Sequence, residues 1–234
     1  MTLPFFYISN YDGVQKNIVL NEETSRHIVQ VLRMKVGESL NLTDGKGNLI
    51  TCSVTDDNKK HCRVEVKETR YKAQGTRMVS IAISLLKNTN RFEWFLEKAT
   101  EIGVSEIIPL ICERTEKEKF RFDRMQGICI SAMLQSQQIW LPLLHEPASF
   151  SSLGKWKVEN GSNFIAHCID GDKAQLTNQQ INQSTLILIG PEGDFTFTEI
   201  ELALENNFIP VSLGETRLRT ETAGVVAAAL FCQI

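Results

Sequence analysis

Two glycine-containing segments in the C-terminal half of the chain carry residue types that could bind a flat ligand. The first spans Leu188–Phe195 and includes Gly190 and Gly193, and the second spans Leu213–Ala223 and includes Gly214. Glycine permits positive φ and lets the backbone approach a ligand closely, so peptide groups there can hydrogen-bond an adenine edge or ribose hydroxyls. Either segment alone is weak evidence, because a Gly-Pro pair is a common loop break. The prediction of a nucleoside site depends on the pair.

Strands and helices alternate in the part of the chain that must position these segments. This alternation predicts a parallel sheet with helices on both faces, in which a ligand lies beyond the carboxyl ends of the strands. The predicted strands are Val79–Leu86, Glu106–Cys112, Phe164–Ile169, Thr185–Ile189 and Pro210–Leu213. Four helices are predicted. The first starts near Asn90 with a buried stripe at Phe92, Phe95, Leu96 and Ala99, and the second spans Phe120–Ile139. The third starts at a Thr196–Glu199 capping box and runs through Leu204, and the fourth spans Arg219–Cys232.

The first seventy residues follow a different pattern, in which several short strands accompany one helix. The helix begins at Asn21 and has Ile28, Val31 and Leu32 as its apolar positions, and residues 44–47 (Asp-Gly-Lys-Gly) predict a hairpin. The strands expected are Phe5–Ile8, Asn17–Leu20, Ser39–Thr43, Leu49–Thr55 and His61–Lys67. So many strands in a short chain predict a compact barrel. The polar stretch 71–76 marks the boundary, so the two expected domains are residues 1–72 and 73–234.

Composition excludes several classes of protein. The chain has 234 residues, of which 42% are hydrophobic, and no uninterrupted apolar run long enough to cross a membrane or to serve as a secretory signal. Its six cysteines form no C-x-x-C pair, so neither a metal site nor a disulfide framework is expected, and reduced thiols in a cytoplasmic protein are the simpler interpretation. The net charge is −3, with a small basic excess in residues 1–72 and an acidic excess beyond, which permits an RNA-contacting first domain.

The two C-terminal segments together resemble the cofactor-binding end of the SPOUT methyltransferase superfamily. More narrowly, they are similar to the ribosomal RNA small-subunit methyltransferase E family, and the likeness covers nearly the whole chain. Its other matching motifs are His27–Arg33, Lys87, Glu93–Lys98, Glu101–Val104, Pro109 and Glu113–Arg114.

The resemblance implies a PUA-like barrel joined to a SPOUT α/β domain whose C-terminal chain forms a deep trefoil knot, with a homodimer formed through the knotted domain. It implies S-adenosylmethionine as cofactor and N3-methyluridine in the 16S ribosomal RNA of the small subunit as product. The residues implied to contact the cofactor are Ala166, His167, Ile189, Gly190, Glu192, Gly193, Leu213, Gly214, Leu218, Thr220 and Ala223.

Arg219 and Glu221 are the candidate catalytic residues for that reaction. Uridine N3 must lose a proton, and the negative charge that develops on O2, N3 and O4 calls for a fixed donor such as the guanidinium of Arg219. Glu221 is expected to accept the proton, to orient Arg219, or simply to stabilise the start of a helix. The candidate RNA-binding residues are Arg26, His27, Arg33, Lys35, Arg114 and Gln135, with Lys59 and Lys60 as further candidates. For any single cation among them, a solvated surface position is the alternative.

One segment departs from the family pattern. The family often has an acidic residue, a glutamine and two arginines before a Leu/Val-Pro pair, whereas Leu134–Pro142 keeps only Gln135 and the Leu-Pro pair. Trp140 could stack on a base there, or it could be a packed tryptophan. Two other functions stay open: a non-catalytic ribosome-assembly factor with a degenerate cofactor pocket, which the intact glycines disfavour, and a methyltransferase with another RNA target. A phosphate-binding loop is disfavoured because no G-x-x-x-x-G-K-[ST] motif is present.

Overall fold

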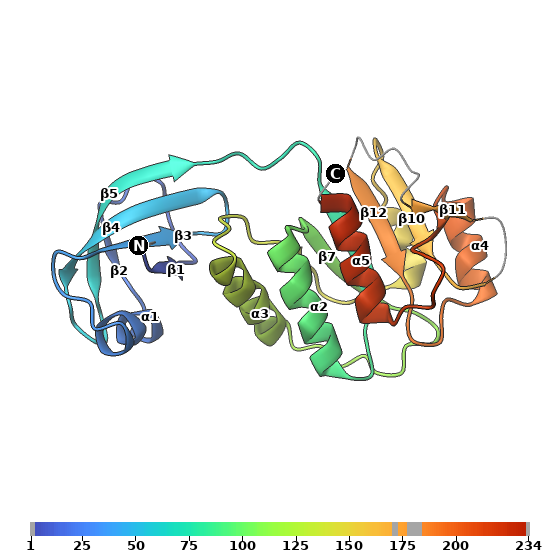
Figure 1. Ribbon diagram of the computed structural model, residues 1–234, viewed down its shortest axis with the longest axis horizontal. Helices are drawn as coiled ribbons and strands as arrows, with labels where there is room; N and C mark the ends of the chain where they lie inside the picture. The colour runs from blue at the N-terminus through green and yellow to red at the C-terminus, as the bar shows by residue number, and fades with distance from the viewer. Residues whose placement is uncertain (1–2, 170–172, 177–183, 233–234) are drawn as a thin grey trace. The chain divides into compact units, whose positions relative to one another are not determined.

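The computed structural model describes residues 3–169, 173–176 and 184–232 of the chain (Figure 1). These residues divide into two compact units. Unit 1 comprises residues 1–74 and 133–141, and unit 2 comprises residues 75–132 and 142–234. Each unit has its own sheet and is described on its own. Across the described residues, each helix is too short or too polar to cross a membrane.

Unit 1 is built on a five-stranded sheet with the strand order β1-β3-β4-β5-β2, in which β1 pairs parallel to β3 and the other neighbours pair antiparallel. Leu40, Leu42, Ile50, Cys52 and Val64 alternate along the strands and point to one fully buried core. The predicted hairpin at residues 44–47 joins β3 to β4. The bounds of the strands are Phe5–Tyr7 for β1, Asn17–Val19 for β2, Ser39–Thr43 for β3, Asn48–Asp56 for β4 and Arg63–Tyr71 for β5.

The helix expected from Asn21 is an α-helical turn followed by a π-helical one. Asn21 caps α1 (Glu22–Arg26) by accepting a hydrogen bond from the Thr24 amide at 2.8 Å, and η1 (His27–Val31) continues it. Ile28 is fully buried as predicted, but Val31 and Leu32 are exposed, so the predicted apolar face is wrong at these two positions. The wider π-helical turn rotates them away from the core side that a 3.6-residue period would give.

Residues 133–141 pack against the hairpin of unit 1. The Trp140 indole Nε1 donates to the Lys72 carbonyl at 2.9 Å, and the Gly47 amide donates to the Ile139 carbonyl at 2.8 Å. A Cβ at Gly47 would lie 2.6 Å from Cζ2 of Trp140, so this close approach requires glycine. Trp140 therefore serves as a packed tryptophan, the second of its two predicted roles.

Unit 2 is built on a parallel sheet whose strand order, over the described residues, is β11-β13-β10-β12-β6-β7-β8, with β9 also paired to β7. All of its pairs are parallel, as predicted. The bounds of the strands are Val79–Ser84 for β6, Glu106–Ile111 for β7, Leu143–Leu144 for β8, Ala148–Ser149 for β9, Ser162–Ala166 for β10, Ala174–Gln175 for β11, Thr185–Ile189 for β12 and Ile209–Ser212 for β13.

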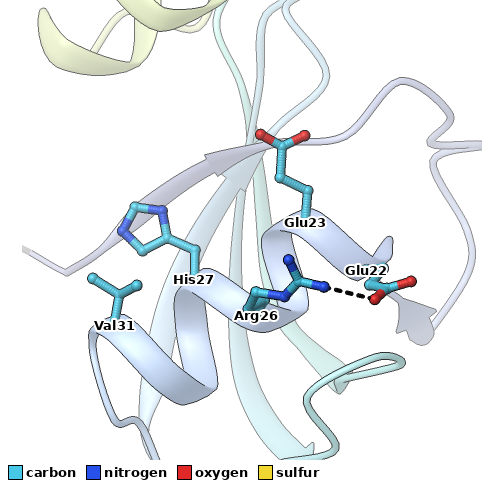
Figure 2. Close-up of a pocket in the computed structure, with 5 residues that line it drawn as sticks. All are labelled: Glu22, Glu23, Arg26, His27 and Val31. Carbon is cyan, nitrogen blue, oxygen red and sulfur yellow. Dashed lines mark hydrogen bonds and ion pairs between the residues drawn. The ribbon is translucent and has the colours of Figure 1, made fainter.

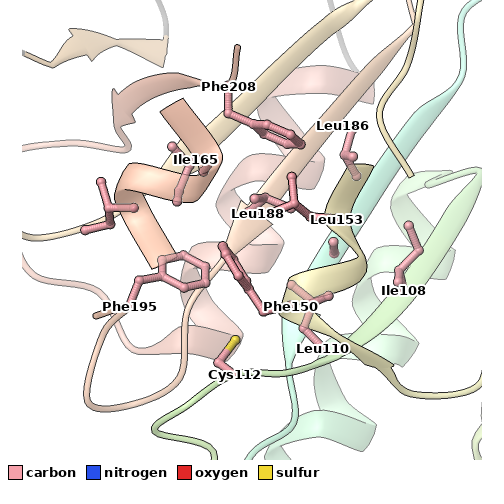
Figure 3. Close-up of a cluster of buried hydrophobic side chains, with 13 residues drawn as sticks. Ile108, Leu110, Cys112, Phe150, Leu153, Ile165, Leu186, Leu188, Phe195 and Phe208 are labelled. Atoms are coloured by element: carbon pink, nitrogen blue, oxygen red, sulfur yellow. The ribbon is translucent and has the colours of Figure 1, made fainter. Parts of the chain in front are cut away.

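Helices cover both faces of this sheet, which confirms the predicted α/β class. On one face, α4 and the 3-10 helix η2 enclose a core in which the rings of Phe150 and Phe195 lie 5.2 Å apart (Figure 3). On the other face, α5 packs on α2, β6 and β12. The bounds of the helices are Thr89–Ile102 for α2, Phe122–Gln135 for α3, Phe150–Lys155 for η2, Phe197–Glu205 for α4 and Thr220–Cys232 for α5.

The predicted capping box at Thr196 is present. The Thr196 hydroxyl accepts a hydrogen bond from the Glu199 amide at 3.3 Å, and the Glu199 carboxylate accepts one from the Thr196 amide at 2.9 Å. Helix α2 begins at Thr89, one residue before the predicted start near Asn90, and its N-cap is Asn88, which accepts from the Asn90 amide at 3.0 Å. The predicted stripe of α2 is buried in full.

Candidate functional site

Three strand ends meet at one edge of the unit 2 sheet. Ala166, the last residue of β10, pairs with Ile189 at the end of β12 on one side and with Val211 of β13 on the other. Because the three strands are parallel and in this register, the segments that follow them leave the sheet together. Both glycine-containing turns therefore start next to the residue pair Ala166 and His167.

The turn after β12 is tightly braced. Asp194 has a φ of +65° and accepts hydrogen bonds from the Phe195 amide at 2.9 Å and from the Cys168 amide at 2.7 Å, which ties this turn to the end of β10. A Cβ at Gly190 would lie 3.1 Å from the Phe195 ring, so this glycine is a close-approach position. Gly190 and Gly193 do not use the positive φ that glycine permits, because Asp194 takes the left-handed conformation of this turn.

The turn after β13 has free space around its glycine, whereas the turn after β12 is packed against Phe195. Gly214 has a φ of +144°, a conformation that L side chains rarely adopt, and nothing lies within 4 Å of where its Cβ would be. The Ser212 hydroxyl braces the turn by donating to the Gly214 carbonyl at 2.8 Å. Leu213, Leu218 and Ala223 are half-buried, and Thr220 is buried at the start of α5.

His167 is a half-buried imidazole at the end of β10. Its Nδ1 is buried and has no hydrogen-bond partner among the described residues. Burial lowers the pKa of His167 and the nearby Lys173 lowers it further, whereas Asp194 and a backbone hydrogen bond with Ile169 oppose the shift. Lys173 donates from Nζ to the His167 carbonyl at 3.0 Å and to the Ile169 carbonyl at 2.8 Å. The arrangement favours a neutral imidazole with one ring nitrogen available to a ligand.

The two candidate catalytic residues lie at the start of α5. Arg219 is exposed, whereas the Glu221 side chain is only 8% exposed and its Oε1 lies 3.6 Å from Nε of Arg91 in α2. Glu221 is also in the first turn of α5, where the helix dipole stabilises a carboxylate. The ion pair of Glu221 is thus with Arg91, which was not among the predicted site residues.

Two of the candidate RNA-binding residues, Arg26 and His27, line a shallow pocket of about 530 Å³ on unit 1 (Figure 2). Arg26 extends toward Glu22, with an ion pair of 2.8 Å, and His27 contacts the ring of Phe6 with the ring centroids 5.6 Å apart. The carboxylates of Glu22 and Glu23 share this pocket with Arg26, so its charge is mixed.

The other candidate RNA-binding residues are distributed over both units. Arg33 is exposed and has a φ of +58°, which is uncommon for a residue other than glycine, and Lys35 is exposed 3.5 Å from Asp57. Gln135 is exposed in unit 1 at the end of α3. Arg114, in unit 2, donates from Nη1 to the Gly193 carbonyl at 2.7 Å, so it holds the turn after β12.

Sequence reasoning did not identify the residues that hold this site in shape. Asp194 follows the second glycine of the first turn directly, and its position before a capped helix was the available signal. Arg91 and Trp94 share one face of α2 at helical spacing, but neither was predicted as a site residue, although Glu93–Lys98 matched a family motif. The long-range partners of Arg91 and Lys173 leave no signal in a single sequence.

The family models match two parts of the chain. A model described as RNA methyltransferase domain matches residues 74–232, and one described as RNA methyltransferase PUA domain matches residues 20–67. The N-terminal sheet is therefore PUA-like, as the resemblance implied.

Similar proteins are known from several bacteria. A ribosomal RNA small subunit methyltransferase E from Synechocystis sp. is 30% identical, with 92% of this chain and 73% of the relative covered. The crystal structure of a probable rRNA-methyltransferase from Porphyromonas gingivalis has a TM-score of 0.90 at 36% identity, over 97% of this chain and 95% of the other. A ribosomal RNA small subunit methyltransferase E from Neisseria gonorrhoeae, solved with S-adenosyl methionine bound, has a TM-score of 0.86 at 28% identity, over the same shares.

Proposed function

The chain belongs to the ribosomal RNA small subunit methyltransferase E family, and from this premise we propose that it methylates uridine N3 in the 16S RNA of the small ribosomal subunit with S-adenosylmethionine as methyl donor. The observation that carries the proposal is the register of β10, β12 and β13, which brings the two glycine-containing turns to one edge of the sheet. A relative with the same fold was solved with this cofactor bound.

The residues at this edge fit an adenosyl group. The open backbone at Gly214 leaves room for a flat ring, and the buried Nδ1 of His167 needs a hydrogen-bond partner that a bound nucleoside can supply. A neutral His167 also avoids repulsion with a sulfonium cation. The residues proposed to hold the cofactor are Ala166, His167, Ile189, Gly190, Glu192, Gly193, Leu213, Gly214, Leu218, Thr220 and Ala223. When bound, S-adenosylmethionine supplies an electrophilic methyl group.

The role of the chain's own side chains is then to prepare the nucleophile. Uridine N3 lies between two carbonyls and carries a proton that must leave before its lone pair can attack. Glu221 is the proposed acceptor for that proton, and Arg219 the proposed donor that stabilises the negative charge left on O2, N3 and O4. Holding the base in line with the methyl group can account for about 7–11 kcal/mol of the barrier.

The proposal includes the remaining features that the family resemblance implies. Residues 1–72 form the RNA-binding domain and residues 73–234 the catalytic domain, with its C-terminal chain knotted and two copies associated through it. Arg26, His27, Arg33, Lys35, Arg114 and Gln135 are proposed to position the RNA, mainly through phosphates. The exposed positions of the four cations among them support this role.

Methyl transfer to small subunits tests the proposal directly. Small subunits from cells that lack this enzyme should accept tritiated methyl groups from S-adenosylmethionine, and mass spectrometry of the 16S RNA should locate N3-methyluridine at one nucleotide. Binding without transfer would show a non-catalytic assembly factor, and a different methylated atom would show another RNA target.

A further inference from the structure

A pocket of about 310 Å³ lies where the first turns of α2 and α5 meet in unit 2. We call this the α2–α5 pocket. The residues that line it are Asn90, Arg91, Trp94, Arg219, Glu221 and Thr222. Its volume is at the low end of the range for small-ligand sites, roughly 300–1,000 Å³, which suits a single base better than a dinucleotide. Only Arg219 and Glu221 have been assigned a role above.

Trp94 is an exposed aromatic residue on the pocket side of α2. It follows Asn90 by four residues and Arg91 by three, so the three side chains share one face of the helix. Phe92, Phe95 and other apolar residues of α2 are buried in the core, whereas Trp94 is 44% exposed. A single exposed apolar residue is common on protein surfaces, so Trp94 becomes informative only through the groups around it.

A buried carboxylate with an unused oxygen is the second observation. Glu221 has one oxygen 3.6 Å from Arg91, while its Oε2 is buried and lacks a hydrogen-bond partner among the described residues. Unsatisfied buried polar atoms are rare in native structures and call for a missing partner. The pocket thus combines an indole face, a carboxylate that can accept a hydrogen bond and the donors of Arg219 and Asn90.

The α2–α5 pocket borders the proposed cofactor edge. Asn90 and Arg91 also line a neighbouring pocket of about 560 Å³, whose wall includes Lys87, Lys117 and Glu192. Glu192 belongs to the turn after β12, and Arg219 follows the turn after β13. A ring in the α2–α5 pocket would therefore lie beside the turns proposed to hold the methyl donor.

We propose that the α2–α5 pocket is the subsite for the unstacked uracil base of the target nucleotide, with Trp94 as the face on which the base stacks. This inference rests on the proposed function and adds the residue that recognises the ring. Uracil fits because it is planar and presents one N–H donor between two carbonyl acceptors, which match the carboxylate of Glu221 and the donors of Arg219 and Asn90.

Two substitutions at one position separate stacking from simple packing. Trp94→Leu keeps an apolar side chain without a π face and should lower kcat/KM for methylation of small subunits about 10- to 100-fold, the loss expected for one base stack. Trp94→Phe keeps a ring and should retain most of the activity. Phe197→Ala, which removes an aromatic side chain that is 69% exposed on α4, is the matched control and should be without effect. Cofactor affinity by calorimetry should be unchanged in all three.

A second measurement does not need turnover. A short uridine-containing RNA should quench tryptophan fluorescence in the wild type and much less in Trp94→Phe. The inference is overturned if the wild type methylates small subunits and Trp94→Leu matches it, or if the RNA quenches both proteins equally. It is also overturned if Trp94→Leu changes the mass in sedimentation, since Trp94 would then be covered by a second copy of the chain. A wild type that shows RNA-dependent quenching of Trp94 but transfers no methyl group would instead contradict the proposed function.

Discussion

Arg219 is the residue on which the proposed chemistry depends most. It is exposed at the start of α5 and lines the α2–α5 pocket, so its guanidinium can reach a bound base. We expect Arg219→Ala to lower the single-turnover rate of methylation about 100- to 1,000-fold, as when a fixed donor to a developing anion is removed. Cofactor affinity measured by calorimetry should stay unchanged.

Arg217→Ala provides the control for this substitution. Arg217 is an exposed arginine two residues earlier in the same segment, and it does not line the pocket. Its removal changes the net charge equally and should leave the rate near that of the wild type. Equal losses in the two variants would mean that Arg219 acts only through general attraction of the RNA.

His167 should make cofactor binding depend on pH. Because burial and Lys173 lower the pKa of His167 in the folded protein, the unfolded chain takes up this proton at higher pH than the folded one. The stability that the neutral imidazole contributes is therefore present above about pH 6.5, the ordinary histidine value, and is lost as the pH falls to the lowered pKa of the folded state. Protonation would also place a cation beside the sulfonium of the cofactor.

Calorimetric titration of S-adenosylmethionine across the pH range below 7.5 measures how protonation of His167 changes the affinity for the cofactor. We expect affinity to fall toward acid pH in the wild type and to vary much less in His167→Asn, which cannot gain the charge. A wild type and a His167→Asn variant with parallel pH profiles would show that another group titrates at the site.

At the scale of elements, α2 and α5 are held together by a close approach at Gly224. A Cβ at this position would lie 2.6 Å and 2.8 Å from ring carbons of Phe95 and 2.9 Å from Cδ1 of Ile83. Overpacking of a buried contact costs about 1–3 kcal/mol. We expect Gly224→Ala to lower Tm by on the order of 5 °C in a chain of this size, and to lower activity because both helices line the α2–α5 pocket.

A glycine-to-alanine substitution in α3 should have the opposite effect on stability. Gly127 is exposed within α3, and nothing lies within 4 Å of where its Cβ would be. Gly127→Ala should therefore stabilise the protein by roughly 0.5–1 kcal/mol, the usual gain from replacing glycine inside a helix. A loss of stability in both variants, measured by thermal unfolding, would argue against a specific clash at Gly224.

The packing of α5 could be predicted only in part from the sequence. The helix predicted over Arg219–Cys232 is present as α5 (Thr220–Cys232), but its neighbours in the fold were not predicted. Gly224 contacts Phe95 and Ile83, and Phe231 stacks on Phe164 at 5.7 Å, so one face of α5 packs on its own unit. Val225 and Leu230 stay half-buried.

Local patterns located most elements because burial imposes a period on the sequence. Strand β12 was predicted at its observed bounds, and the Thr196 capping box marked the start of α4, since both depend on neighbouring residues. The two-residue strands β8, β9 and β11 were not predicted, because so short a stretch has no period. The π-helical turn at η1 was missed for a related reason, as its hydrogen-bond pattern leaves no distinct repeat in the sequence.

Long-range partners account for what remained hidden in the site. The two glycine-containing turns could be predicted because glycine and its neighbours are a local signal. The pairing of Glu221 with Arg91, and of Asp194 with the Cys168 amide, joins residues that only the strand order of the sheet brings together. The order β13-β10-β12-β6 cannot be read from a sequence in which those strands alternate with helices of similar length.

At the scale of the whole molecule, the chain combines a PUA-like unit with a methyltransferase unit, each with a separate core. The proposed division of labour assigns RNA positioning largely to unit 1, although the net charge of the chain is −3. Local basic residues must then supply the attraction, and Arg33 and Lys35 are the exposed candidates that follow η1. The left-handed backbone of Arg33 is that of a residue ending a helix, since the Met34 amide donates to the Ile28 carbonyl at 3.0 Å across it.

The double variant Arg33→Ala with Lys35→Ala tests this division. Binding should release fewer counterions when phosphate contacts are lost, so the affinity for small subunits should fall. The negative slope of log affinity against log salt should become shallower by about 1 per lost contact. Cofactor affinity should stay the same, because the proposed cofactor site is in unit 2. Lys16→Ala, at another exposed lysine of unit 1, should change the slope little. If Lys16→Ala weakens binding as much per charge removed, RNA is attracted to unit 1 as a whole and not held at the surface that follows η1.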